Sequence, residues 1–97
     1  MTVKILGRGN EKGRDGFENA LTSLVARMIG ADEKDRAGMM NYCISTLMSK
    51  TLSAHGTNYA LINELIGVLE CAKLELYRRV ASPYEDLKIQ SNGDVFQ

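Results

Sequence analysis

The sequence predicts an all-α protein, a small helical bundle of three main helices with a short capped C-terminal helix. Apolar residues recur every three or four positions over three long stretches, which is the period of an amphipathic helix. Glycine or proline follows each stretch, at Gly30, Gly56 and Pro83. Because 97 residues suffice for one modest core, we expect a single α-helical domain over residues 1–97.

The first segment, residues 1–14, shows no helical period. The run TVKIL reads as extended, but a single strand without a partner cannot form a stable sheet. The glycine-rich run GRGNEKGRDG that follows is typical of a loop, and its glycine spacing does not fit a phosphate-binding loop. We therefore expect residues 1–14 to form a flexible or extended arm.

The first helix is expected over residues 15–29. Its apolar residues recur at helical spacing: Phe17, Leu21, Leu24, Val25 and Met28. Asp15 and Glu18 have the spacing of a capping box, in which two side chains satisfy the free backbone N–H groups of a helix start. Gly30 stands where a helix-terminating glycine is common, so the helix should end at residue 29.

The second helix is expected over residues 38–55. The preceding run ADEKDRAG reads as a polar connector or as the first turns of this same helix, capped by Asp32. The apolar stripe of the helix is formed by Met40, Cys43, Ile44, Leu47, Met48 and Thr51. Gly56 directly after His55 predicts the end of the helix.

The third and longest helix is expected over residues 58–81, and its apolar residues cover more than one face. Such a wide stripe indicates packing on two sides, within the chain or against a second copy. Pro83 lacks a backbone N–H and should stop this helix. Ser82 as N-cap, Pro83 in the first turn and Glu85 as capping-box partner then predict a short fourth helix over residues 83–90.

One long stretch of the chain resembles a known family. The segment NYALINELIGVLECAKLELYRRVASPYEDLKIQSNGDV at 58–95 and the segment NYCIS at 41–45 are similar to small bacteriophage and prophage proteins of unknown function. Members of that family carry an LNYAIT segment and a tail of the form IGxLExAKxExYRRVxxPYEDxKxxNGDV. The resemblance implies a phage-encoded protein in the cytoplasm of a bacterial host, and it brings no known activity with it.

Composition argues against several classes of partner. Twelve basic residues balance twelve acidic ones, which does not favour the broad basic surface that duplex nucleic-acid binding uses. No apolar run approaches the roughly 18 to 20 residues that span a bilayer, and the N-terminus lacks the apolar core of a signal peptide. We therefore expect no membrane partner. The two cysteines lie among apolar residues of predicted helices, so we expect no disulfide.

The residues that catalysis or metal binding requires are also sparse. His55 is the only histidine, and no GxSxG nucleophile motif occurs. All-α nucleotide hydrolases hold magnesium with paired ExxE carboxylates, whereas Glu64, Glu70 and Glu75 are six and five residues apart. We expect no catalytic residue, no metal site and no cofactor.

Two groups of residues are candidates for ligand binding. In the first, cations could grip an anion such as a nucleotide phosphate while an aromatic ring stacks on its base: Lys73, Tyr77, Arg78, Arg79 and Tyr84. The second is Asn41 with Tyr42, polar side chains beside the apolar stripe of the second helix. The alternative for the first group is an ion-pair network with Glu70, Glu75, Glu85 and Asp86, within the chain or between subunits.

These observations favour a non-catalytic phage accessory protein that binds a host-derived ligand and interferes with host defence or metabolism. The ligand would be a small nucleotide signal or a host protein. A structural, assembly or replication accessory that acts only through protein contacts is the alternative, followed by a small all-α metal-dependent nucleotide hydrolase. The small core and the five methionines also predict a homo-oligomer built on helix 58–81 and the YRRVASPYED segment.

Overall fold

Helices make up nearly all of the chain that the structure describes. The computed structural model describes residues 11–94 and 96, with side chains from residue 13 onward. Its elements, in chain order, are α1 (Glu11–Ile29), α2 (Glu33–His55), α3 (Tyr59–Leu76), the π-helical segment η2 (Tyr77–Ala81) and α4 (Ser82–Asn92). The described residues contain no strand. The predicted all-α class, with three main helices and a short last one, is confirmed.

The chain divides into two units between Asn58 and Tyr59. The N-terminal unit contains α1 and α2, and the C-terminal unit contains α3, η2 and α4. Each unit is a separate body with its own geometry, and the single domain over residues 1–97 stays a prediction.

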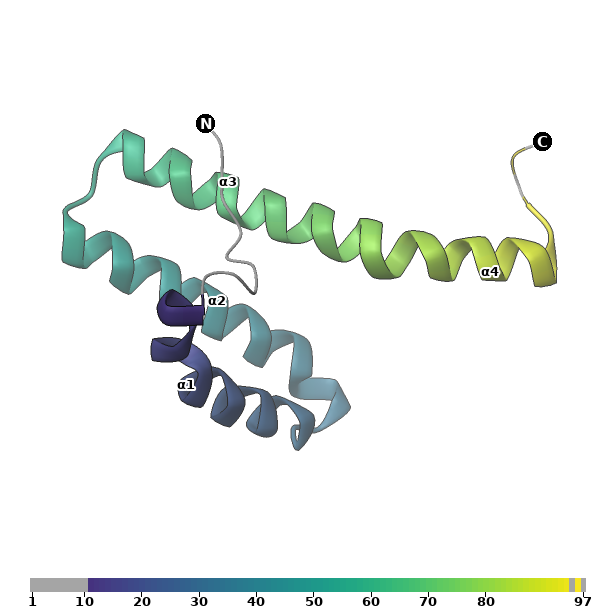
Figure 1. Cartoon of the computed structure of the whole chain (residues 1–97), viewed down its shortest axis with the longest axis horizontal. Helices are drawn as coiled ribbons and strands as arrows, with labels where there is room; N and C mark the ends of the chain where they lie inside the picture. The colour runs from purple at the N-terminus through teal and green to yellow at the C-terminus, as the bar shows by residue number, and fades with distance from the viewer. Residues whose placement is uncertain (1–10, 95, 97) are drawn as a thin grey trace. The chain divides into compact units, whose positions relative to one another are not determined.

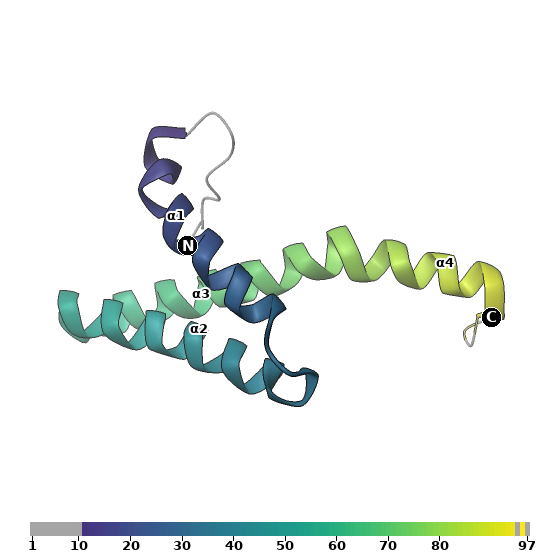
Figure 2. The same cartoon turned by 90° about the horizontal axis from the view of Figure 1, so that it is seen from below.

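In the N-terminal unit, α1 and α2 meet at a short turn. The N–H of Gly30 donates to the carbonyl of Ala26 and the N–H of Ala31 to that of Met28, both at 3.2 Å. Asp32 then has extended backbone angles (φ −60°, ψ 140°) directly before α2, as expected of an N-cap residue. From this turn the two helices diverge (Figure 2).

The starts of both helices lie earlier than expected. α1 begins at Glu11, so Asp15 lies inside it and the predicted capping box is wrong. Residues 1–10 of the expected arm lie outside the described residues, while 11–14 are helical. Glycine costs a helix only about 1 kcal/mol, so the glycines near this start do not prevent helical backbone. α2 begins directly after Asp32, which is the alternative that the polar run ADEKDRAG left open.

Both predicted helix ends are confirmed, at Ile29 and at His55. Gly56 follows α2 with φ +86°, and Gly93 follows α4 with the same φ. A side chain at such an angle is sterically disfavoured, which is why glycine occupies both positions.

The C-terminal unit is one continuous helix, here called the C-terminal rod (Tyr59–Asn92), and Figure 1 shows α3 and α4 as a single ribbon. The predicted stop at Pro83 is therefore wrong. Proline cannot donate to the carbonyl of Arg79, four residues earlier, and its ring crowds that carbonyl in a regular α-helix. The wider π-helical turn η2 precedes this point, and the N–H of Ser82 donates to the carbonyl of Tyr77, five residues back. The wider turn lets the chain pass Pro83 without leaving the helix.

The predicted cap at Ser82 is also wrong. Ser82 has helical backbone angles (φ −63°, ψ −49°), and α4 has no side-chain cap hydrogen bond at its start. Asn92 and Gly93 do close the helix as expected, with the N–H of Gly93 donating to the carbonyl of Ile89 at 2.8 Å.

Replacing Ser82 by alanine is expected to leave the free energy of unfolding unchanged or to raise it by up to about 0.5 kcal/mol. No cap is lost, and alanine has the higher helix propensity. Thermal and denaturant unfolding followed by circular dichroism measure the effect. A loss of about 1 kcal/mol or more, the usual cost of deleting an N-cap, would show that Ser82 caps α4 after all.

No residue of the described chain is buried. Large apolar side chains stay exposed in both units, for example Phe17 (61%), Leu47 (65%) and Leu76 (65%). Burial of apolar surface is the main driving force of folding, so these helices need further apolar surface to cover them.

Candidate functional site

A groove runs between α1 and α2 within the N-terminal unit. At the end near the turn it is a cleft of about 920 Å³, and it continues as a second cleft of about 730 Å³. Leu24, Tyr42 and Cys43 line both clefts, which joins them into one α1–α2 groove. Both volumes fall in the range of small-molecule binding sites, roughly 300 to 1,000 Å³.

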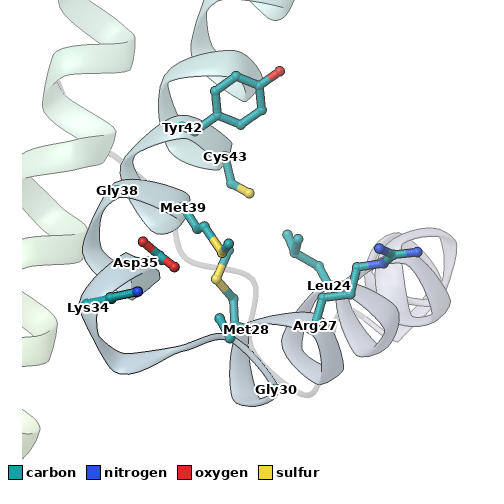
Figure 3. Close-up of a pocket in the computed structure, with 11 residues that line it drawn as sticks. Leu24, Arg27, Met28, Gly30, Lys34, Asp35, Gly38, Met39, Tyr42 and Cys43 are labelled. Carbon is teal, nitrogen blue, oxygen red and sulfur yellow. The ribbon is translucent and has the colours of Figure 1, made fainter.

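The walls of the groove near the turn are largely apolar. Figure 3 shows Met28 of α1 and Met39 of α2 pointing into it from opposite sides, with Leu24 also on α1. Tyr42 and Cys43 follow one turn farther along α2. Methionine adapts its shape to what it contacts, so this wall can accommodate the apolar part of a ligand.

Charged and aromatic side chains complete the groove. Arg27 and Lys34 line it, and neither forms an ion pair with any carboxylate of the described residues. Asp35 is the one acidic residue among the lining residues near the turn. Tyr42 is 71% exposed, which leaves its ring open for stacking. In the cleft near the turn, two cations, an aromatic ring and an apolar wall together fit an aromatic anion.

The structure places the predicted site residues in different units. Tyr42 lines the groove, whereas its neighbour Asn41 is exposed and is not among the lining residues. The other candidates lie in the C-terminal rod, and three of them form η2 together with Val80 and Ala81: Tyr77, Arg78 and Arg79. Single π-helical turns within α-helices are frequent at functional sites.

Each predicted cation of the rod has a carboxylate partner. The ammonium of Lys73 lies 2.8 Å from Oε1 of Glu70. Arg78 and Arg79 share Glu75, with Nη2 of Arg78 and Nε of Arg79 each 2.6 Å from one of its two oxygens. These contacts are the intrachain ion pairs that the alternative interpretation predicts.

The aromatic candidates of the rod are engaged as well. The hydroxyl of Tyr77 donates to Oε2 of Glu85 at 3.1 Å, and the ammonium of Lys88 lies 5.5 Å from the ring centre of Tyr84. Four acidic and four basic residues occupy the stretch from Glu70 to Lys88, so the segment as a whole carries no excess positive charge. We define the YRRVASPYED corner as residues 77–86.

Two pKa values reflect these contacts. The hydrogen bond from Arg79, followed by the charges of Arg78 and Arg79, lowers the pKa of Glu75, although partial desolvation opposes the change. The hydrogen bond to Glu85 and its charge raise the pKa of Tyr77, and Asp86 adds to this effect. Both side chains are accessible to water, where such pairs stabilise a fold only weakly.

The carboxyl of Glu75 is expected to titrate below its ordinary pKa of 4.5. Because the folded state lowers this pKa, the stabilising effect is present above pH 4.5 and is lost as the pH falls through the lowered value. Carbon-detected NMR of the side-chain carboxyl measures the midpoint. Arg79→Gln should move that midpoint upward, and a midpoint unchanged by this substitution would contradict the contact.

Metal binding finds no support in the described part of the chain, where no three histidine, cysteine or acidic side chains cluster. Both cysteines are free thiols, Cys43 in the groove and Cys71 in α3. No helix among the described residues has the length and apolar character to cross a membrane.

Sequence reasoning missed Arg27 and Lys34. The sequence analysis did not select either residue, since they lie seven positions apart and belong to different helices. They line one groove only because the chain reverses between Gly30 and Asp32. Met28 and Met39 lie on either side of this turn, but methionines in two separate helices do not by themselves predict a shared groove.

Comparison with known proteins identifies the family and nothing finer. No curated protein and no solved structure matches the chain. A family described as Domain of unknown function (DUF6899) matches residues 10–95, which covers nearly the whole chain. The chain therefore belongs to the DUF6899 family.

Proposed function

We propose that this protein is a non-catalytic binding protein that captures a small aromatic anion of the nucleotide class in the α1–α2 groove. The observation that carries the proposal is the lining of the cleft near the turn, which contains two cations without a carboxylate partner among the described residues, Arg27 and Lys34, and the exposed ring of Tyr42. Guanidinium and ammonium groups bind phosphate, and an exposed ring stacks on a base.

The biological setting rests on the resemblance to bacteriophage proteins. A protein of that kind acts in the cytoplasm of a bacterial host, where nucleotide signals serve defence and metabolism. Sequestering such a signal requires binding without conversion, and Glu64, Glu70 and Glu75 are six and five residues apart rather than in the ExxE spacing of magnesium-dependent all-α nucleotide hydrolases. The proposed role is interference with host defence or metabolism by holding a host nucleotide.

The test is direct measurement of nucleotide binding. Mass spectrometry of small molecules released from the purified protein, and calorimetric titration with a panel of linear and cyclic nucleotides, should reveal at least one ligand at micromolar concentration. If none binds below millimolar concentration, nucleotide capture is excluded. Ligand turnover in the presence of magnesium would instead show a hydrolase.

Protein contact is the second candidate function, and the absence of any buried side chain in the described residues favours it. The exposed apolar surface of both units fits a homo-oligomer, a structural accessory or a protein that occupies a host target. Light scattering across a dilution series is its first test, with a mass of two chains or more expected. A mass of one chain throughout would remove the homo-oligomer.

The YRRVASPYED corner provides a separate prediction for nucleotide binding. If Arg78 and Arg79 bind phosphate by displacing Glu75, lysine at either position should weaken nucleotide binding several-fold and leave the fold intact, because lysine cannot form two parallel hydrogen bonds. If the corner is an ion-pair network, Arg79→Lys should leave nucleotide binding unchanged and lower the oligomer mass or the melting temperature. Calorimetry and light scattering on the same samples separate the two results.

A further inference from the structure

The C-terminal rod carries an apolar stripe that its own unit leaves uncovered. Four stripe side chains are 58–65% exposed and recur every three or four residues: Leu76, Val80, Tyr84 and Leu87. A single helix has no second surface against which to bury such a stripe, and most helical stability in proteins comes from that burial.

A row of polar side chains follows one edge of this stripe. Glu70 and Lys73 share the edge, because their side chains form an ion pair one turn apart. Tyr77 and Glu85 share it as well, since their hydrogen bond spans eight residues. In a regular α-helix, side chains eight residues apart point in directions that differ by about 80° around the helix axis. The π-helical turn η2 advances less per residue and removes most of this difference between Tyr77 and Glu85. Lys88 follows Glu85 by three residues and continues the row.

The charges of this row are symmetric about Arg79. Glu70 lies nine residues before Arg79 and Lys88 nine residues after it, while Lys73 and Glu85 each lie six residues away. Each pair that is equidistant from Arg79 therefore combines one acid with one base. In an antiparallel pair of identical helices, the same edge of both helices meets, and residues equidistant from the twofold axis face each other.

We propose that two copies of this chain pair antiparallel through their C-terminal rods, with the twofold axis at Arg79. Glu70 then faces the partner's Lys88, and Lys73 faces the partner's Glu85. The partner is a second copy because the charges of the row complement themselves in this arrangement.

The apolar stripe fits the same arrangement. With the axis at Arg79, the two Val80 side chains lie beside the axis, and Leu76 falls between the partner's Val80 and the partner's Tyr84. In a parallel pair, the polar row of one copy lies against the opposite edge of the other copy's stripe. Glu70 then lies near the partner's Glu75, which carries the same charge. Charge and apolar spacing thus favour the antiparallel direction.

This inference extends the proposed self-association and does not depend on the nucleotide, because the groove belongs to the N-terminal unit. The two proposals can fail separately. A nucleotide-free sample tests the pairing, and a chain that binds nucleotide as a monomer would overturn the pairing alone.

Two full-length variants with opposite charges provide the main test. An acidic variant carries Lys73→Glu with Lys88→Glu, and a basic variant carries Glu70→Lys with Glu85→Lys. Each variant alone should associate at least tenfold more weakly than the wild type, because its row becomes a single sign and repels its own copy. An equimolar mixture should recover the paired mass by forming mixed pairs, as measured by light scattering and native mass spectrometry.

Two outcomes of this experiment overturn the proposal. If each variant alone keeps the mass and the dissociation constant of the wild type, the polar row does not lie at an interface, as when helices of the same chain cover the stripe. If the variants dissociate and the mixture does not recover, the charges do not face each other.

The direction of pairing has its own measurement. A spin label on Gln90→Cys, with Cys43 and Cys71 replaced by alanine, reports the distance between the two labels of a pair. Residues 90 lie eleven positions beyond the axis in each copy, so an antiparallel pair separates them by about 33 Å, against about 10 Å in a parallel pair. A pulsed electron resonance distance near 10 Å, or no distance between copies, overturns the antiparallel pair.

Discussion

Tyr42→Ala is expected to weaken nucleotide binding by about 5- to 150-fold, since stacking of one base on an aromatic side chain contributes roughly 1–3 kcal/mol. Tyr42 lines both clefts of the α1–α2 groove, and its ring is 71% exposed and open to a ligand. Tyr42→Phe keeps the ring and should keep most of the affinity. Calorimetric titration of both variants with the nucleotide that binds the wild type tightest measures the effect.

A matched control exists in the C-terminal rod. Tyr59 is 84% exposed and does not line the groove, so Tyr59→Ala should leave the affinity unchanged. Because Tyr42 is exposed, its truncation should also leave the helical circular dichroism signal intact. Wild-type affinity in Tyr42→Ala would exclude the groove as the binding site, whereas an equal loss in Tyr59→Ala would show that the effect is not specific to it.

Helix ends that depend on local chemistry were predictable from the sequence. Gly30 and Gly56 follow the last residues of α1 and α2, and α3 begins directly after Asn58. The passage through Pro83 was not predictable, because it depends on a one-turn change of helical type in the preceding residues. Local rules describe proline in a regular α-helix, and a π-helical turn removes the clash that those rules assume.

The candidate site divides in the same way. Tyr42 could be selected from the sequence, since it is an aromatic residue beside an apolar stripe. The partners of Arg78 and Arg79 could be anticipated too, because Glu75 lies three and four residues before them on one helix. The groove itself could not be anticipated, because it depends on how α1 and α2 diverge after the turn. Divergence of two helices is a tertiary property that helical periodicity does not encode.

Dilution is expected to lower both the helical content and the melting temperature of the protein. No described residue is buried, and in the proposed pair a second copy supplies the apolar contacts that cover the exposed stripe. Each tenfold dilution removes about 1.4 kcal/mol from the association free energy, which for a domain of this size corresponds to a decrease of roughly 5 °C or more in melting temperature. Thermal unfolding followed by circular dichroism between micromolar and hundred-micromolar concentration measures it.

Substitutions of two leucines of α3, Leu74 and Leu76, test which face of the helix forms the contact between copies. Leu76 belongs to the apolar stripe of the C-terminal rod, while Leu74, two residues away, lies about 200° around the helix on the opposite side. Leu76 is 65% exposed and Leu74 is 55% exposed.

Leu76→Lys should raise the dissociation constant of the oligomer at least tenfold and lower the melting temperature, because it places a charge in the contact. Leu74→Lys adds the same charge and should change both quantities little. Equal effects of the two substitutions, or a wild-type melting temperature independent of concentration, would place the contact elsewhere than on this stripe.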